Sequence, residues 1–389
     1  MIYVAVESDY SSESDDESFD TLPEVSPSSI CSKKRQSSEF AVLGQKRVLD
    51  DLSRHMFGVT VEVSPKNKRP CSSDFRFAVQ PQVVFCCESS RRNSRVTMED
   101  FVTVEMNLFG SERHPVFYAG VFDGHNGNST SEVLHRLLHE SIKTRVDLFD
   151  PFTENETTRE ILNQVFLEFD LALLRMERDE YRCNKSNVLR RTGKPVKLRR
   201  AVASVGAGRS TSCSGSTATI VLVSRDKAVI AWVGDSRAVL CRNGVAKRLT
   251  RDHKGTDALE RERIRTCGGM VSSGGRLYHD LSISRAFGSF KHKFHDITTE
   301  DTIVDAAIQL RNPLLCVPEI EIVDIQTTDE FIVIASDGVW DTLSDEQVAS
   351  FIKTQVQIGN KNTAAELLVD FAIAQGSTDN VSAVCAFFY

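Results

Sequence analysis

The 389-residue chain is long enough for one large core or two ordinary ones, with room left for tails. Its 41% hydrophobic and 26% charged residues are typical of a globular protein, no apolar run approaches the ~18 residues of a membrane span, and the net charge of −7 argues against a nucleic-acid binder. The start lacks the basic and apolar stretches of a secretory signal and the ten cysteines form no CxxC pair, so we expect reduced thiols and a nuclear or cytoplasmic location.

Residues 1–78 differ in composition from the rest of the chain. Up to Glu24 the segment is acidic and serine-rich, which predicts a disordered regulatory tail. Ser12 and Ser14 each precede a carboxylate by three residues, a pattern that acidophilic kinases favour, although a solvated tail has the same composition. Basic clusters at 33–35 and 46–47 have the spacing of a bipartite nuclear import signal, although such clusters also arise by chance.

The globular region is expected over residues 79–389. Short apolar runs rich in β-branched residues predict buried strands at 116–122, 217–223, 228–233 and 331–335. Because long amphipathic helices are expected between some of these strands, the pattern predicts an α+β domain of sheets covered by helices.

Three of these helices have clear sequence signals. Leu134, Leu138 and Ile142 recur on one face after Ser129–Thr130, which predicts a helix beginning there. Ser344 is predicted to cap a second helix, and a third around 367–371 is predicted to end near Gly376.

A basic stretch over residues 184–212 interrupts this pattern. It contains eight Lys or Arg, no acidic residue and many small residues, which predicts a flexible surface insertion. A solvated loop is the simpler interpretation, and docking of an acidic partner or substrate is the alternative.

Acidic residues lie at the ends or edges of several apolar segments. They occur in five clusters: Glu99-Asp100, Asp123-Gly124-His125, Asp235-Ser236-Arg237, Asp337-Gly338-Val339-Trp340-Asp341 and Asp379-Asn380. A single Asp after a strand is usually a turn residue or a helix cap. Five such positions converging at sheet edges would be costly unless cations neutralised them.

The ligand types predict the kind of cation. Oxygen ligands without matching His or Cys favour Mg²⁺ or Mn²⁺ over zinc, and two such ions about 4 Å apart can activate a water toward phosphorus. His125 could protonate a departing alkoxide, although a lone His is more often structural. Arg95 could bind a phosphate through two parallel hydrogen bonds. These residues alone indicate metal-assisted phosphoester hydrolysis.

Eleven motifs resemble, in order, those of the type 2C metal-dependent protein serine/threonine phosphatases. They are Arg95-x-x-Met98-Glu99-Asp100, Val121-Phe122-Asp123-Gly124-His125, Ser214-Gly215-Ser216-Thr217-Ala218, Val233-Gly234-Asp235-Ser236-Arg237, Asp252-His253-Lys254, Glu260-x-x-Arg263-Ile264, Gly268-Gly269, Ser284-Arg285-Ala286-Phe287-Gly288, Val317-Pro318-Glu319, Ser336-Asp337-Gly338-Val339-Trp340-Asp341 and Asp379-Asn380. The resemblance covers residues 80 to 389 and identifies 79–389 as a phosphatase catalytic domain.

The resemblance implies a central antiparallel β-sandwich flanked by α-helices, in α-β-β-α layers, with a dinuclear Mg²⁺ or Mn²⁺ site at one end. It implies that Asp123 bridges both ions, that Gly124 offers its carbonyl, and that Asp337 and Asp379 complete one ion's shell. A metal-bound water would attack phosphoserine or phosphothreonine of protein substrates directly, with no phosphoenzyme. We expect a monomer with no nucleic-acid or membrane partner.

The remaining roles follow from the same resemblance. Glu99 would bind the second ion through water, with Asp100 supporting it. Arg95 resembles the phosphate-binding arginine and His125 the general acid, while Asp235 corresponds to a ligand of a weaker third metal.

The chain also departs from the family pattern. Ser289 follows the Ser-Arg-Ala-Phe-Gly motif where Asp is usual, Gly255 stands in place of a Pro, and Asn126 in place of Ala or Gly. The segment 291–316 is longer than expected. None of these changes removes an expected core ligand, so an active phosphatase is favoured over a catalytically weak binding or regulatory module.

Overall fold

The computed structural model describes residues 83, 85–110, 115–145, 155–192, 213–224, 226–294 and 311–388, with the backbone alone over 180–192. The predicted tail, its Ser12 and Ser14 sites and its basic clusters lie outside these residues. Among the described helices, none is both long and apolar enough to cross a bilayer.

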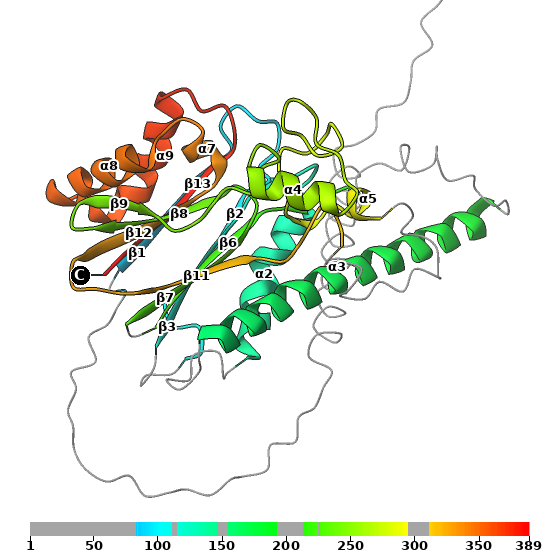
Figure 1. Cartoon of the computed structure of the whole chain (residues 1–389), viewed down its shortest axis with the longest axis horizontal. Coiled ribbons are helices and arrows are strands. Elements are labelled where there is room, and N and C mark those ends of the chain that lie inside the picture. The colour runs from blue at the N-terminus through cyan, green and yellow to red at the C-terminus, as the bar shows by residue number, and fades with distance from the viewer. Residues whose placement is uncertain are drawn as a thin grey trace, which may run out of the picture. The chain divides into compact units, whose positions relative to one another are not determined.

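Two five-stranded antiparallel sheets form the centre of the domain (Figure 1). The first has the order β1-β13-β12-β8-β9, with bounds Phe85–Arg91, Val381–Phe387, Asp329–Ala335, Arg237–Arg242 and Val245–Arg248. The second has the order β11-β7-β6-β3-β2, with bounds Glu319–Asp324, Lys227–Val233, Ala218–Ser224, Val116–Phe122 and Phe101–Glu105. The predicted strands are confirmed within a residue or two.

A third, smaller sheet joins short strands near the site. Its order is β10-β5-β4, with bounds Phe287–Gly288, Gly215–Ser216 and Gly124–His125. Because β5 pairs with both neighbours, this sheet brings the segment after residue 123 beside the segment around residue 288.

Helices flank the two large sheets. The described helices are α2 (Ser129–Lys143), α3 (Asn155–Thr192), α4 (Ala258–Thr266), α5 (Phe290–Lys293), α7 (Asp337–Trp340), α8 (Asp345–Gln357), the 3-10 helix η2 (Lys361–Thr363) and α9 (Ala364–Ala374). In Figure 1, α8 and α9 lie over the β1–β9 sheet, while α2 and α3 lie on the side of the β2–β11 sheet. The predicted α+β sandwich is therefore confirmed.

Apolar side chains fill the space between the two sheets. Both inner faces contribute fully buried residues, such as Val121 and Ile230 from one sheet and Ile332 and Val384 from the other. This alternation follows from the period of two along each strand, which sends the intervening residues outward to the helices.

The helix ends predicted from capping residues and from Gly376 agree with the structure. The Ser344 side chain accepts a hydrogen bond from the Gln347 N–H, and the Gln347 side chain accepts one from the Ser344 N–H, so the predicted cap of α8 is a capping box. Helix α2 begins at the predicted residue, and α9 ends two residues before Gly376.

One local prediction is wrong. Residues 184–192 belong to α3 and are not a loop, whereas 193–212 lie outside the described residues. Leu, Lys and Arg are good helix formers, and the first strong helix breakers in the stretch are Gly193 and Pro195. A high density of positive charge therefore did not end the helix.

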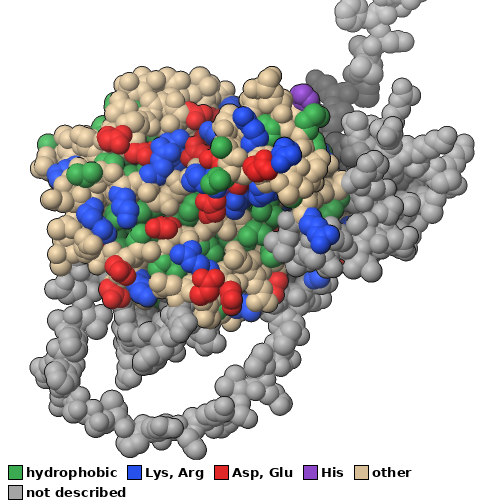
Figure 2. Space-filling view, viewed as in Figure 1, with side chains coloured by type: hydrophobic (Ala, Val, Ile, Leu, Met, Phe, Trp, Pro, Cys, Tyr) green, Lys and Arg blue, Asp and Glu red, His purple; other side chains and the backbone are tan. Residues whose placement is uncertain are grey.

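The face shown in Figure 2 mixes basic and acidic side chains over its described part. Ion pairs among the described residues include Arg237 with Asp252 and Arg248 with Asp345.

Candidate metal centre

Three aspartates converge at one end of the sandwich. A carboxylate oxygen of each of Asp123, Asp235 and Asp337 lies within 4.8 Å of the others. All three were singled out from the sequence, where Asp235 was expected to serve only a weaker third ion.

The sheet topology explains this convergence. Asp123 directly follows β3 and Asp235 lies two residues after β7, and both strands flank β6 in the same sheet. Asp337 comes from the opposite sheet, where it opens α7 two residues after β12. The candidate centre therefore spans both sheets, and each side chain is held at a rigid strand end.

The cluster is electrostatically unfavourable by itself. Burial raises the pKa of Asp123 well above its ordinary value of 3.8, and the nearby charges of Asp337, Asp100 and Asp235 raise it further. Burial and the charge of Asp235 likewise raise the pKa of Asp337. Buried carboxylates that repel one another bind divalent cations, which neutralise them.

One ammonium group lies at the edge of the cluster. Lys254 Nζ is 3.2 Å from Asp235 Oδ2 and 3.7 Å from Asp341 Oδ1. Burial raises the pKa of Asp235, and Lys254 opposes this effect. Lys254 thus neutralises the outer side of the cluster, next to the expected site of the third ion.

Asp379 lies apart from the group of three and contacts Arg95. Arg95 Nη2 donates to Asp379 Oδ2 at 2.5 Å, and the Arg95 side chain is 58% exposed. Asn380 fixes the two loops together, because its Nδ2 donates to the Thr97 carbonyl at 3.0 Å and its Oδ1 accepts from the Glu99 N–H at 2.7 Å. The expected phosphate-binding arginine therefore lies beside an expected metal ligand.

Glu99 and Gly124 are also neighbours. The Gly124 N–H donates to the Glu99 carbonyl at 3.2 Å, and a Cβ on Gly124 would lie only 2.5 Å from that carbonyl oxygen. Glu99 Oε2 accepts from the Gly127 N–H at 3.1 Å. Asp100 is 3% exposed, burial raises its pKa to about 6, and its Oδ2 has no hydrogen-bond partner among the described residues. An oxygen-only donor set with an unsatisfied buried carboxylate oxygen fits a hard divalent cation.

His125 lies next to this centre, on β4. Its Nε2 is 2.7 Å from Ser289 Oγ. Burial lowers the pKa of His125 to about 4, and the nearby positive charges of His292 and Lys293 act in the same direction.

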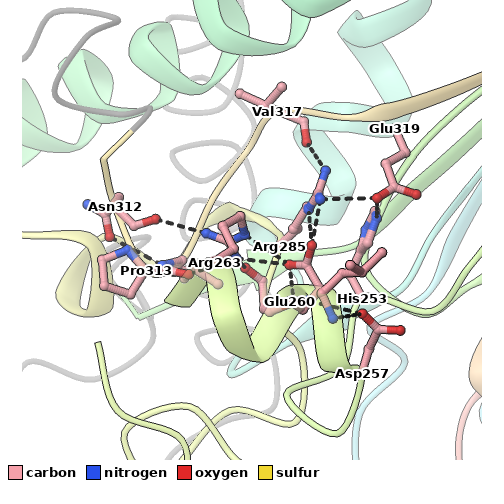
Figure 3. Close-up of polar contacts among 12 residues, drawn as sticks. His253, Asp257, Glu260, Arg263, Arg285, Asn312, Pro313, Val317 and Glu319 are labelled. Atoms are coloured by element: carbon pink, nitrogen blue, oxygen red, sulfur yellow. Dashed lines mark hydrogen bonds and ion pairs between the residues drawn. The ribbon is translucent and has the colours of Figure 1, made fainter. Parts of the chain in front are cut away.

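A second acidic group, formed by His253, Glu260 and Glu319, also has ligand atoms within 4.8 Å of one another (Figure 3). Glu260 Oε1 accepts from Arg285 Nη2 at 2.5 Å, and Glu260 Oε2 accepts from Arg263 Nη2 at 2.9 Å. Arg285 Nη2 also donates to Glu319 Oε1 at 3.1 Å.

Arginines neutralise this second group. Burial alone would raise the pKa of Glu260, but hydrogen bonds and charges from Arg285 and Arg263 hold it well below its ordinary value. The pKa of Glu319 is lowered to about 2, because His253 and Arg251 outweigh its burial. Both Glu260 oxygens and Glu319 Oε1 already accept from guanidinium groups that neutralise the two carboxylates, so the donor set does not fit a metal.

His253 connects the second group to the first. The Gly234 N–H donates to His253 Nδ1 at 3.1 Å, and the His253 N–H donates to the Gly234 carbonyl at 2.9 Å. Gly234 immediately precedes Asp235. The arginine-rich cluster therefore supports the turn that carries an aspartate of the candidate centre.

Two contacts were not predicted from the sequence. Lys254 was noted only within a motif, and Ser289 only as a departure from the family pattern. The family motifs marked both positions, but the contacts depend on pairing between segments distant in the chain.

Comparison with known proteins shows the family to which the chain belongs. The family model described as Protein phosphatase 2C matches residues 86–381. Probable protein phosphatase 2C 11 of Arabidopsis thaliana is 31% identical over 302 residues, which cover 77% of this chain and 65% of that protein, and Protein phosphatase 1B of Mus musculus is 31% identical over 305 residues, which cover 77% and 69%. The match thus spans just under two thirds of the Arabidopsis relative.

A solved structure shows the same fold. The serine-threonine phosphatase 2C from Toxoplasma gondii has a TM-score of 0.54 and 20% identity, covering 78% of this chain and 94% of that one.

Proposed function

The chain belongs to the protein phosphatase 2C family, and from that premise we propose that it is a metal-dependent protein serine/threonine phosphatase. Its substrates would be phosphoproteins, and its cofactors two Mg²⁺ or Mn²⁺ ions with a weaker third.

The observation that carries the proposal is the convergence of Asp123, Asp235 and Asp337 from two sheets, with the pKa of each raised by burial. These residues, with Glu99 and Asp379 nearby, would hold the ions. When bound, the ions would supply Lewis-acid activation of water and would neutralise charge on the phosphoryl oxygens.

The chain's own side chains would complete the reaction. Arg95 is more than half exposed and lies beside Asp379, so its guanidinium is accessible to a phosphate at this end of the sandwich. His125 would give a proton to the departing serine or threonine oxygen, a poor leaving group unless it is protonated.

The test is phosphate release from a phosphothreonine peptide by the full chain with Mn²⁺ or Mg²⁺. We expect release that requires the metal, stops with a chelator and is lost in Asp123→Asn. Absence of metal-dependent release, or an Asp123→Asn variant as fast as wild type, would overturn the proposal. A truncation that removes residues 1–78 is expected to keep its turnover, since every residue with a proposed role lies beyond this segment.

A further inference from the structure

The contact between His125 and Ser289 joins two segments that are 164 residues apart, at 2.7 Å between Nε2 and Oγ. Ser289 is fully buried and directly precedes α5. A buried hydroxyl on an imidazole nitrogen restricts the ring's rotation and gives that nitrogen a defined partner.

The backbone around Ser289 is held on several sides. The Ser289 N–H donates to the Ser214 carbonyl at 2.7 Å, and the N–H of Gly288 donates to Asp170 Oδ1 at 2.8 Å. Lys293 Nζ donates to the other oxygen of Asp170 at 2.7 Å, and both of these charged side chains are buried. The hydroxyl position is therefore fixed by the framework and not by the serine side chain alone.

Ser289 also adopts an unfavourable backbone conformation. Its φ of +50° lies in the left-handed region, which is unfavourable for a residue other than glycine. The surrounding hydrogen bonds hold the residue there despite this cost. Such strain is concentrated at functional sites.

Room for the contact is provided by Gly215 on β5, which pairs with both His125 and Gly288. A Cβ at residue 215 would overlap both Ser289 Oγ and His125 Nε2. The absence of a side chain at this position permits the hydroxyl and the ring to meet.

From this geometry we propose that Ser289 is a positioning residue for His125: its hydroxyl holds the imidazole in the orientation from which it protonates the leaving oxygen. The inference rests on the proposed phosphatase function. Because Ser289 Oγ occupies Nε2, the proton given to the leaving oxygen would come from Nδ1. The Nε2–H would donate to the Ser289 hydroxyl both before and after that transfer.

The first test compares two substrates with Ser289→Ala. For a phosphothreonine peptide we expect kcat to fall by about 10- to 100-fold, part of the usual contribution of general acid catalysis, with KM within about twofold. For p-nitrophenyl phosphate, whose leaving group departs without a proton, we expect a fall below about threefold. Equal losses on both substrates would overturn the proposal.

Two further variants address folding and coupling. The methyl group added by Gly215→Ala would separate Ser289 Oγ from His125 Nε2. This variant should therefore lose activity on the phosphothreonine peptide and not on p-nitrophenyl phosphate, as Ser289→Ala does. In a His125→Ala background, Ser289→Ala should cause no additional loss, because residues that act as a unit are not additive. Additive losses would contradict the proposal. Ser141→Ala, a buried serine late in α2 that bonds the Leu137 carbonyl, is the control and should match wild type.

A readout independent of turnover separates this proposal from the proposed function. Long-range ¹H–¹⁵N spectra of the histidine rings should show His125 as one tautomer in wild type and altered in Ser289→Ala. Averaged tautomers in wild type, or unchanged signals in the variant, would overturn the positioning role. An inactive wild type with a fixed His125 ring would overturn the phosphatase and leave the contact established.

Discussion

This domain contains two side-chain groups whose candidate ligand atoms lie within 4.8 Å of one another, but the pKa values of their carboxylates are shifted in opposite directions. In the first, burial and mutual repulsion raise the pKa values of Asp123 and Asp337. In the second, Arg285 and Arg263 hold the pKa of Glu260 well below its ordinary value. Proximity of carboxylates therefore does not identify a metal site.

The difference lies in the partners that the fold supplies. In the second group, guanidinium groups occupy both oxygens of the buried Glu260 and one oxygen of the partly exposed Glu319 (Figure 3). In the first group, the neutralising contact found among the described residues is that of Lys254, on its outer side. An acidic group becomes a candidate cation site when its charge is left for a cation to neutralise.

The largest expected effect comes from removing a carboxylate of the first group. Asp337→Asn should weaken Mn²⁺ binding by at least about 100-fold and phosphate release by roughly 1,000-fold, because metal activation contributes several kcal/mol and about 1.4 kcal/mol is tenfold. Titration calorimetry and peptide turnover measure the two effects. Asp370→Asn, an exposed position on α9, is the control. If Asp337→Asn bound Mn²⁺ as tightly as wild type, the first group would not be the cation site and would not differ from the second in this respect.

A substitution in the second group should instead lower the stability of the fold. Glu260→Gln removes the buried anion that pairs with Arg285 and Arg263, so the free energy of unfolding should fall by roughly 3–5 kcal/mol. Mn²⁺ affinity of the folded variant should change by less than about threefold. Urea unfolding and Mn²⁺ titration provide the measurements, with Glu262→Gln, exposed on the same helix, as the control. A stable variant that had lost Mn²⁺ binding would assign this group to the metal centre.

The pH dependence of unfolding should have opposite signs for the two groups when a chelator is present. Because the folded pKa of Asp337 is raised, this carboxyl group contributes a loss of stability as pH rises from about 4, so the stability gained by Asp337→Asn should grow toward neutral pH. The pKa of Glu319 is lowered from 4.5 to about 2, so its contribution is full above 4.5 and is lost as pH falls toward 2.

The deficit of Glu319→Gln should therefore be largest at neutral pH and should shrink below pH 4.5. Urea unfolding of both variants and wild type from pH 3 to 8 measures how each substitution changes the free energy of unfolding. If this change had the same pH dependence in both variants, the two groups would not differ in charge compensation.

Local features of this fold were predictable from sequence, because a strand or a helix cap depends on neighbouring residues. The run 116–122 and the Ser344 cap are examples. Partner assignments were not predictable, because they depend on strand order. Asp235 seemed peripheral in the sequence, yet β6 alone separates its strand from that of Asp123. Likewise, Ser289 meets His125 only because β5 pairs with both β4 and β10.

The smallest expected effect concerns the cation that the chain itself supplies. Lys254 lies between Asp235 of the first group and the neighbouring Asp341, so its ammonium competes with bound ions for Asp235. A unit charge about 4 Å away is worth about 1 kcal/mol in water and more where burial reduces screening. Lys254→Met should therefore tighten Mn²⁺ binding by roughly five- to tenfold, measured by calorimetry and by the EPR signal of free Mn²⁺.

A matched control separates this local effect from a general change in charge. Lys353 pairs with Glu330 at 3.0 Å on another part of the domain, and Lys353→Met should leave Mn²⁺ affinity unchanged. If Lys254→Met bound Mn²⁺ more weakly than wild type, Lys254 would be holding Asp235 in position for the ions. The first group would then depend on a fixed basic partner, as the second does. The two groups would differ only in how far basic side chains neutralise their carboxylates.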